Sequence, residues 1–106
     1  LLAAELAAAA RRGRLPRCVV SVDLYGQPAD IPALRRACDA WGVPLVSDSA
    51  CALGAAQHGR PAGRGARLAV LSFNGNKIVT AGGGGALRPH DPALIARARH
   101  LATQAR

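Results

Sequence analysis

Apolar positions along the chain recur with two different spacings, which predicts an alternation of strands and helices. Short runs of apolar and β-branched residues are typical of buried strands, whereas apolar residues spaced three and four apart are typical of amphipathic helices. Strands are expected at residues 18–22, 43–46, 68–72 and 86–88, and helices at 1–12, 30–41, 49–57 and from 91 onward. Continuously apolar strands that alternate with helices predict an α/β fold with a largely parallel sheet.

Local signals mark where these elements begin and end. Asp30 and Asp91 precede helical runs as N-cap residues, and Gly42 ends the helix that Asp30 begins. That helix carries apolar residues at helical spacing up to Trp41, so this face of the helix is expected to pack. Cys18 stands beside two valines at the start of the first strand and is expected to be a small buried hydrophobe.

Composition bounds the domain and excludes several classes of protein. The 106 residues suffice for one small domain, and 50% of them are apolar, so a hydrophobic core can form. The chain has 24 alanines and only three aromatic residues, which predicts a core of Ala, Leu and Val. The apolar content is too high for a disordered chain, and no uncharged apolar run approaches the roughly 20 residues of a membrane span.

The formal net charge of +8 does not by itself indicate a nucleic-acid partner. Thirteen of the 14 basic residues are arginines, and they are scattered along the chain without a run of five like charges. Nucleic-acid binders concentrate their charge on one face and interleave aromatic residues for stacking, and here aromatic residues are nearly absent. The three cysteines follow no CxxC spacing, so we expect reduced thiols in a cytoplasmic protein and no metal site.

Candidate chemistry gathers where the predicted strands end. Ligands of open α/β sheets bind beyond the carboxyl ends of the strands, which directs attention to residues 23–27, 47–51 and 72–77. Asp48 ends one of these strands. Its carboxylate is either the N-cap of the following segment or the floor of a ligand site, where it would keep a ring nitrogen protonated.

The segment after the third strand holds the other two candidates. Lys77 is the one lysine in a chain that otherwise uses arginine, so it is either a solvated loop residue or a nucleophile that forms a Schiff base. Ser72 is either a turn former or a ligand of a phosphate oxygen. The glycine run at 82–85 fits no phosphate-loop pattern and is expected to permit close backbone packing around the lysine turn.

Taken together, these segments resemble the DegT/DnrJ/StrS family of sugar-nucleotide aminotransferases. The family pattern has a strand that ends in an acidic residue and Asp, then Ala-x-x-x-Gly, and later Ser-Phe-x-x-x-Lys with a Gly-Gly turn. This chain has Asp48 followed by Ala50 and Gly54, then Ser72-Phe73-Asn74-Gly75-Asn76-Lys77 and the glycine run. The resemblance covers nearly all 106 residues. It implies a three-layer α/β sandwich with a mostly parallel sheet, as in the large domain of fold type I pyridoxal-phosphate transferases.

The resemblance also implies a role for each matching residue. Lys77 would bind pyridoxal 5'-phosphate covalently and move the proton, Asp48 would pair with the pyridine nitrogen, and Ser72 would hydrogen-bond the phosphate. Cys51 would also lie at the cofactor, where the family usually has Gln, Glu or His. Ser47 replaces the usual Glu before Asp48. The implied reaction moves an amino group from an amino acid, usually glutamate, to a nucleotide-linked keto-deoxy sugar for surface polysaccharides or secondary metabolites.

The same resemblance implies a longer enzyme that forms a homodimer, while the scattered charge and the lack of a long apolar run predict no nucleic-acid and no membrane partner. Residues 1–106 would be the central part of the large, cofactor-binding domain, without its N-terminal segment and the C-terminal small domain. We therefore expect the 106-residue chain alone to have little or no turnover. The alternative is a non-catalytic remnant or a basic α/β binding module.

Overall fold

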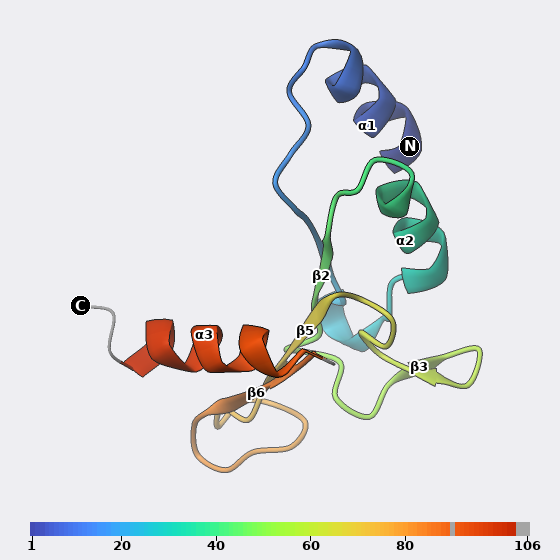
Figure 1. The fold of residues 1–106 in the computed structure, drawn as a ribbon. Helices are drawn as coiled ribbons and strands as arrows, with labels where there is room; N and C mark the ends of the chain where they lie inside the picture. The colour runs from blue at the N-terminus through green and yellow to red at the C-terminus, as the bar shows by residue number, and fades with distance from the viewer. Residues whose placement is uncertain (90, 104–106) are drawn as a thin grey trace.

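The computed structural model describes residues 1–89 and 91–103, and its centre is a four-stranded sheet (Figure 1). The elements follow one another along the chain as α1 (Leu2–Arg11), β1 (Val19–Val22), the 3-10 turn η1 (Leu24–Gly26), α2 (Ile31–Asp39), β2 (Leu45–Asp48), β3 (Ala56–Gln57), β4 (Arg60–Pro61), β5 (Leu68–Ser72), β6 (Gly85–Arg88) and α3 (Pro92–Thr103). Residues 104–106, into which the C-terminal helix was expected to continue, lie outside the described part of the chain.

The sheet has the order β1-β2-β5-β6, in which β1, β2 and β5 are parallel and β6 is antiparallel to β5. The predicted α/β fold with a largely parallel sheet is therefore confirmed. The register pairs Val22 with Asp48, and Asp48 with Val70. Because parallel strands run in the same direction, the carboxyl ends of β1, β2 and β5 meet at one edge of the sheet.

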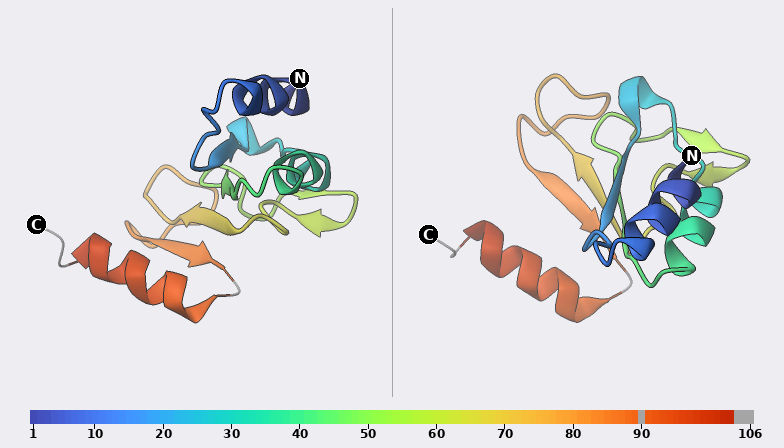
Figure 2. Two further views of the ribbon diagram at one scale, coloured as in Figure 1. Left: turned by 45° about the horizontal axis from the view of Figure 1, so that its top comes forward. Right: turned by 90° about the horizontal axis from the view of Figure 1, so that it is seen from above.

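Helices α1 and α2 lie side by side and cover one face of the sheet (Figure 2). The buried core under them consists of Leu6, Ile31, Cys38, Val43 and Leu45. Alternate side chains of a strand point to opposite faces, so only every second residue of β1 and β2 reaches this core. The Asp30 and Asp91 side chains cap α2 and α3 as predicted, each accepting a backbone N–H from the first turn at 3.0 Å.

The opposite face of the sheet is open in this structure, and this corrects the prediction of a fully buried first strand. Val20 and Val22 are 56% and 55% exposed, because the two helices cover only the face to which Val19 points. Cys18 is also exposed rather than buried, since it precedes a strand at the edge of the sheet. The buried cysteine is instead Cys38, on the inner face of α2.

Two predicted helices differ from the structure. Helix α2 ends at Asp39, and Trp41 lies 40% exposed in the following turn, where Gly42 takes a left-handed φ of 64°. Residues 49–57 contain no helix. The Ala52 N–H donates to the Ser49 carbonyl at 3.0 Å, which is the spacing of a single turn, and the chain then enters the hairpin of β3 and β4. Gly54 has a φ of 88°, which is incompatible with a right-handed helix continuing through this residue.

Candidate active site

The loops that follow β1, β2 and β5 come together at the carboxyl edge of the sheet (Figure 2, right). The first residue after β1 and the first residue after β2 each bond to the neighbouring strand: the Asp23 N–H donates to the Asp48 carbonyl of β2 at 2.9 Å, and the Ser49 N–H donates to the Val70 carbonyl of β5 at 3.0 Å. These are the three segments that the sequence singled out. The candidate residues of the chain therefore share one end of the fold, as expected for an open α/β sheet.

Lys77 and Cys51 are brought into contact, although they lie 26 residues apart. The Lys77 Nζ donates to the Cys51 Sγ at 3.2 Å. The loop that carries Lys77 is closed at its base, because Phe73 donates to the Gly84 carbonyl and accepts from the Ala81 N–H, both at 3.0 Å. Lys77 therefore lies on a pinned loop, that is, a loop whose two ends are joined by backbone hydrogen bonds, and its side chain contacts the turn that follows β2.

Asp48 lies on the open face of β2, beside its register partners Val22 and Val70. Its Oδ1 accepts the Ala50 N–H at 3.1 Å, so the carboxylate caps a turn. It is not the N-cap of a helix, since the next element along the chain is strand β3. Oδ2 of the same carboxylate has no hydrogen-bond partner among the described residues. One oxygen thus fixes the carboxylate locally, and the other is available to a ligand donor.

A buried polar cluster lies directly behind Asp48, and the sequence interpretation missed it. This cluster, the Asp23 cluster, consists of Asp23, Ser47 and Ser49, each with 0% exposure. The Ser49 hydroxyl donates to Asp23 Oδ2 at 2.6 Å, and the Ser47 hydroxyl lies 3.5 Å from the same oxygen and 3.1 Å from Ser49 Oγ. Asp23 Oδ1 accepts the Ala29 N–H at 2.8 Å, so the buried carboxylate is satisfied on both oxygens.

The Asp23 cluster holds Asp48 in place from the opposite face of the strand. Ser47 and Ser49 flank Asp48 in the sequence, and strand alternation sends their side chains to the face opposite to that of Asp48. Asp23 binds the side chains of both serines and, through its own N–H, the Asp48 carbonyl. Two serines around a strand-end Asp were the sequence signal that could have revealed this support. Ser47, noted only as a departure from the family pattern, is part of it.

Ser72 ends β5 in register with Gly85. Its hydroxyl accepts the Asn74 N–H at 3.4 Å, which is the contact of a turn former. No hydrogen bond joins Ser72 to Asp48 or Lys77 among the described residues, so its phosphate role stays a prediction. A Cβ on Gly85 would lie 2.6 Å from the Leu71 carbonyl oxygen, so the predicted close backbone packing is confirmed for this glycine. For Gly82, Gly83 and Gly84 the prediction is wrong, because a Cβ there would meet no atom within 4 Å.

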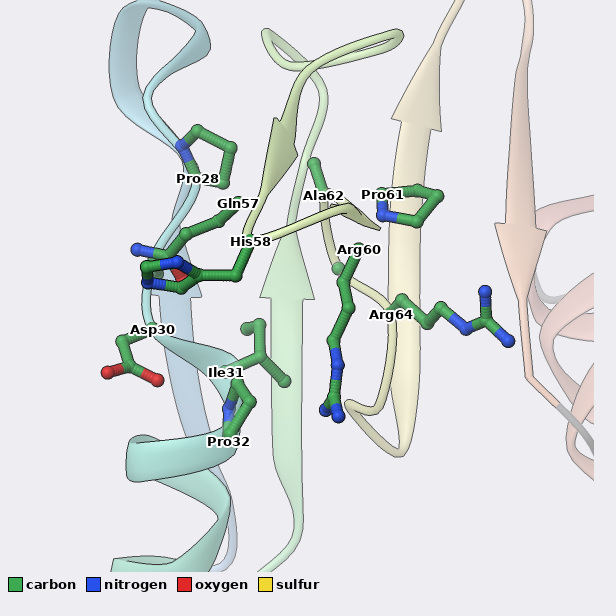
Figure 3. Close-up of a pocket in the computed structure, with 12 residues that line it drawn as sticks. Pro28, Asp30, Ile31, Pro32, Gln57, His58, Arg60, Pro61, Ala62 and Arg64 are labelled. Atoms are coloured by element: carbon green, nitrogen blue, oxygen red, sulfur yellow. The ribbon is translucent and has the colours of Figure 1, made fainter.

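A separate hollow of about 320 Å³ lies between the start of α2 and the β3–β4 hairpin (Figure 3). Ile31 and Pro32 face His58 and Arg60 across it, and His58 takes a left-handed φ of 49° at the hairpin turn. None of the candidate residues of the carboxyl edge lines this hollow. Among the described residues, no group of three or more His, Cys, Asp or Glu is placed to hold a metal ion, and no helix is long and apolar enough to cross a membrane.

The sheet topology and the likeness to solved aminotransferase structures define the class of fold, the α/β fold of the fold type I transferases. Within that class, the chain belongs to the DegT/DnrJ/EryC1/StrS aminotransferase family, whose sequence profile matches residues 2–106. The resemblance drawn from the strand-end Asp, the Ser-Phe-x-x-x-Lys run and the glycine turn is therefore confirmed.

Named relatives agree with this membership. EpsN of Bacillus subtilis strain 168, whose name assigns it to the pyridoxal phosphate-dependent aminotransferases, is 48% identical over 98 residues, or 92% of this chain and 25% of EpsN. The dTDP-3-amino-3,4,6-trideoxy-alpha-D-glucose transaminase of Streptomyces venezuelae is 43% identical over 80% of this chain and 23% of its own length. A solved DegT/DnrJ/EryC1/StrS aminotransferase from Brucella abortus has a TM-score of 0.80 at 26% identity, over 92% of this chain and 27% of that one. The chain thus spans about a quarter of the length of these relatives.

Proposed function

We propose that residues 1–106 are the central part of the cofactor-binding large domain of a pyridoxal-phosphate-dependent sugar aminotransferase. The observation that carries the proposal is the placement of Lys77 in a pinned loop, against the β2 turn that also begins at Asp48. The family match over residues 2–106 supports the reaction class. The reaction moves an amino group from an amino acid, with glutamate as the first donor to test, to a nucleotide-linked keto-deoxy sugar.

The donor set at the carboxyl edge fits pyridoxal phosphate. Lys77 offers a primary amine for the cofactor's carbonyl carbon, and Asp48 has a free carboxylate oxygen for the protonated ring nitrogen. Ser72 offers a hydroxyl at a strand end for the phosphate, and Cys51 lies beside the amine. Bound pyridoxal phosphate supplies an electron sink for the carbon that gains or loses the amino group.

The chain's own residues then do two things in the reaction. The Lys77 Nζ can accept a proton from the reacting carbon and return it, since an amine on a flexible stem reaches several positions. Asp48, kept in orientation by the Asp23 cluster, stabilises positive charge on the ring nitrogen by its own negative charge. A nucleotide sugar is the expected acceptor because the Streptomyces venezuelae relative is named for a dTDP-linked amino sugar.

Wider features of the proposal come from the family resemblance. They are a cytoplasmic homodimer and a place in the synthesis of surface polysaccharide or secondary-metabolite sugars. The glutamate donor rests on the same resemblance. Size-exclusion chromatography with light scattering tests the dimer, and product analysis with a panel of amino acids tests the donor.

Absorbance spectroscopy tests the cofactor assignment. Protein expressed from its complete reading frame and mixed with pyridoxal phosphate should gain an absorbance band near the short-wavelength end of the visible range. Borohydride should abolish this band. Lys77→Arg keeps the positive charge but cannot bind the carbonyl, so this matched variant should lack the band. The same band in Lys77→Arg and Lys77→Ala would remove Lys77 from the site. Steep salt-dependent DNA binding that is indifferent to Lys77 would instead favour the basic binding module.

A further inference from the structure

The contact between Lys77 and Cys51 joins the one amine side chain of the sequence to an exposed thiol. Nζ and Sγ lie 3.2 Å apart, and backbone bonds hold Lys77 itself on one loop and the neighbour of Cys51 on the other. The Lys77 N–H donates to the Asn74 carbonyl at 3.0 Å, and Ala52, next to Cys51, is fully buried and donates to the Ser49 carbonyl at 3.0 Å. Two pinned loops therefore bring a nucleophilic nitrogen to a sulfur that solvent can reach.

The three cysteines of the chain differ in the two properties that oxidation chemistry needs. Cys38 is fully buried, and its burial, followed by the negative charge of Asp39, raises the pKa of its thiol, so it is a poor nucleophile. Cys18 is exposed, but the chain's one lysine lies against Cys51 instead. Arginine guanidinium groups stay protonated and cannot replace that amine. Cys51 alone combines exposure with an amine in contact.

We propose that Cys51 and Lys77 form a reversible sulfur–nitrogen cross-link when a peroxide oxidises the thiol. First, the Cys51 thiolate attacks the peroxide: an S–O bond forms, the O–O bond breaks, sulfur loses two electrons to the peroxide, and water leaves once protonated. Second, the neutral Lys77 amine attacks the sulfenic acid sulfur: an S–N bond forms, the S–O bond breaks, and the departing hydroxide takes the amine proton as water. A small-molecule thiol reverses the link by attacking sulfur and releasing the amine, and a second thiol frees Cys51.

The cross-link and the cofactor compete for the same nitrogen. This consequence rests on the proposed function, since it assumes that Lys77 binds pyridoxal phosphate through Nζ. An oxidised protein would hold Lys77 away from the cofactor until a thiol reduced the link. Bound cofactor would in turn protect the pair, because Nζ would no longer be free to attack sulfur. Cys51 would thus make cofactor loading sensitive to redox conditions.

Peptide mass spectrometry tests the link without any measurement of activity. Cofactor-free protein from the complete reading frame is treated with equimolar hydrogen peroxide, alkylated and digested. We expect a peptide pair joined between residues 51 and 77, two hydrogens lighter than the sum of its parts, which dithiothreitol separates. Cys51→Ser and Lys77→Arg should each abolish the pair. Cys18→Ser, which removes the exposed cysteine that has no amine in contact, should leave its yield unchanged.

Two outcomes overturn the proposal. Cys51 recovered as sulfinic acid with no joined peptide would show that the amine does not capture the sulfenic acid, and a Cys18–Cys51 disulfide would show that another thiol captures it first. A further arm adds pyridoxal phosphate before the peroxide and should lower the yield of the joined peptide. Cross-linking without any cofactor band would contradict the proposed function alone, and a cofactor band without cross-linking would contradict the link alone.

Discussion

The hydrogen bond between Ser49 and Asp23 should contribute strongly to stability, since it is short, buried and made to a carboxylate. Ser49→Ala removes a 2.6 Å donor and leaves Asp23 Oδ2 with only the Ser47 hydroxyl, 3.5 Å away. Hydrogen bonds to charged groups contribute about 1.5–3 kcal/mol, so we expect Ser49→Ala to lower the free energy of unfolding by about 2 kcal/mol. Asp23→Ala also frees the Ala29 N–H from its 2.8 Å bond and should lower it by about 3–5 kcal/mol.

A double-mutant cycle isolates the pair. Urea unfolding followed by far-UV circular dichroism on both single variants and the double variant should give a coupling energy of about 2 kcal/mol. Ser21→Ala is the matched control, because its hydroxyl makes only a 3.5 Å contact to the Val46 carbonyl and should cost less than about 0.5 kcal/mol. A coupling energy below about 0.5 kcal/mol would refute the strength assigned to this bond.

The same variants test whether the Asp23 cluster positions Asp48. Ser49→Ala should weaken the binding of pyridoxal phosphate in a spectroscopic titration at temperatures where the variant stays folded. The reason is that the residue after Asp48 loses its side-chain hydrogen bond to Asp23. Ser21→Ala should leave that affinity unchanged. Lost stability with unchanged cofactor affinity in Ser49→Ala would show that the cluster supports the fold and does not position Asp48.

Three other outcomes follow from the geometry. Gly63→Ala should lower the free energy of unfolding by about 2–5 kcal/mol, since the new Cβ would lie 2.7 Å from both the Ala69 Cβ and the Ser49 Oγ, at a φ of 70°. Gly42 has a similar φ of 64° but open space around it, so Gly42→Ala should lower the same quantity by only about 1–2 kcal/mol. Urea titration measures both. Tyr25→Asn should raise the unfolding temperature, because Tyr25 is 93% exposed and has a left-handed φ of 53° that asparagine tolerates better. A lower unfolding temperature would mean that the tyrosine ring makes stabilising contacts with the rest of the protein. Burial raises the pKa of the Cys38 thiol, so its contribution to stability is present below the ordinary thiol pKa and is lost as the pH rises through the raised one. Cys38→Ala should remove that loss from thermal unfolding curves recorded at a series of alkaline pH values above the ordinary thiol pKa.

Elements with a local cause could be predicted from the sequence. The N-caps of α2 and α3 depend on one aspartate each, and β5 depends on a run of apolar residues, so these elements lie where the pattern placed them. The exposure of Val20 and Val22 could not be predicted, because their spacing says nothing about which face of a sheet a helix covers.

The site divides in the same way. Lys77 and Asp48 are conspicuous by residue type and by position at strand ends. The contact of Lys77 with Cys51 and the bond of Asp23 with Ser49 join residues 26 apart, which only the fold brings together. Residues 49–57 have helix-forming composition, yet a buried hydroxyl at Ser49 bonded to Asp23 and a left-handed Gly54 fix turns there instead.

The alternation of Ser47, Asp48 and Ser49 also fixes the register of β2 by chemistry rather than by apolar pattern. A slip of one residue would exchange the faces of the strand, sending the Asp48 carboxylate against Asp23 and both hydroxyls out to the open side. Two buried carboxylates without a cation would then repel each other, and this repulsion disfavours the slipped register. A single-residue insertion between Gly42 and Leu45 would therefore be absorbed in the loop before the strand, and the ligand-facing aspartate would keep its place.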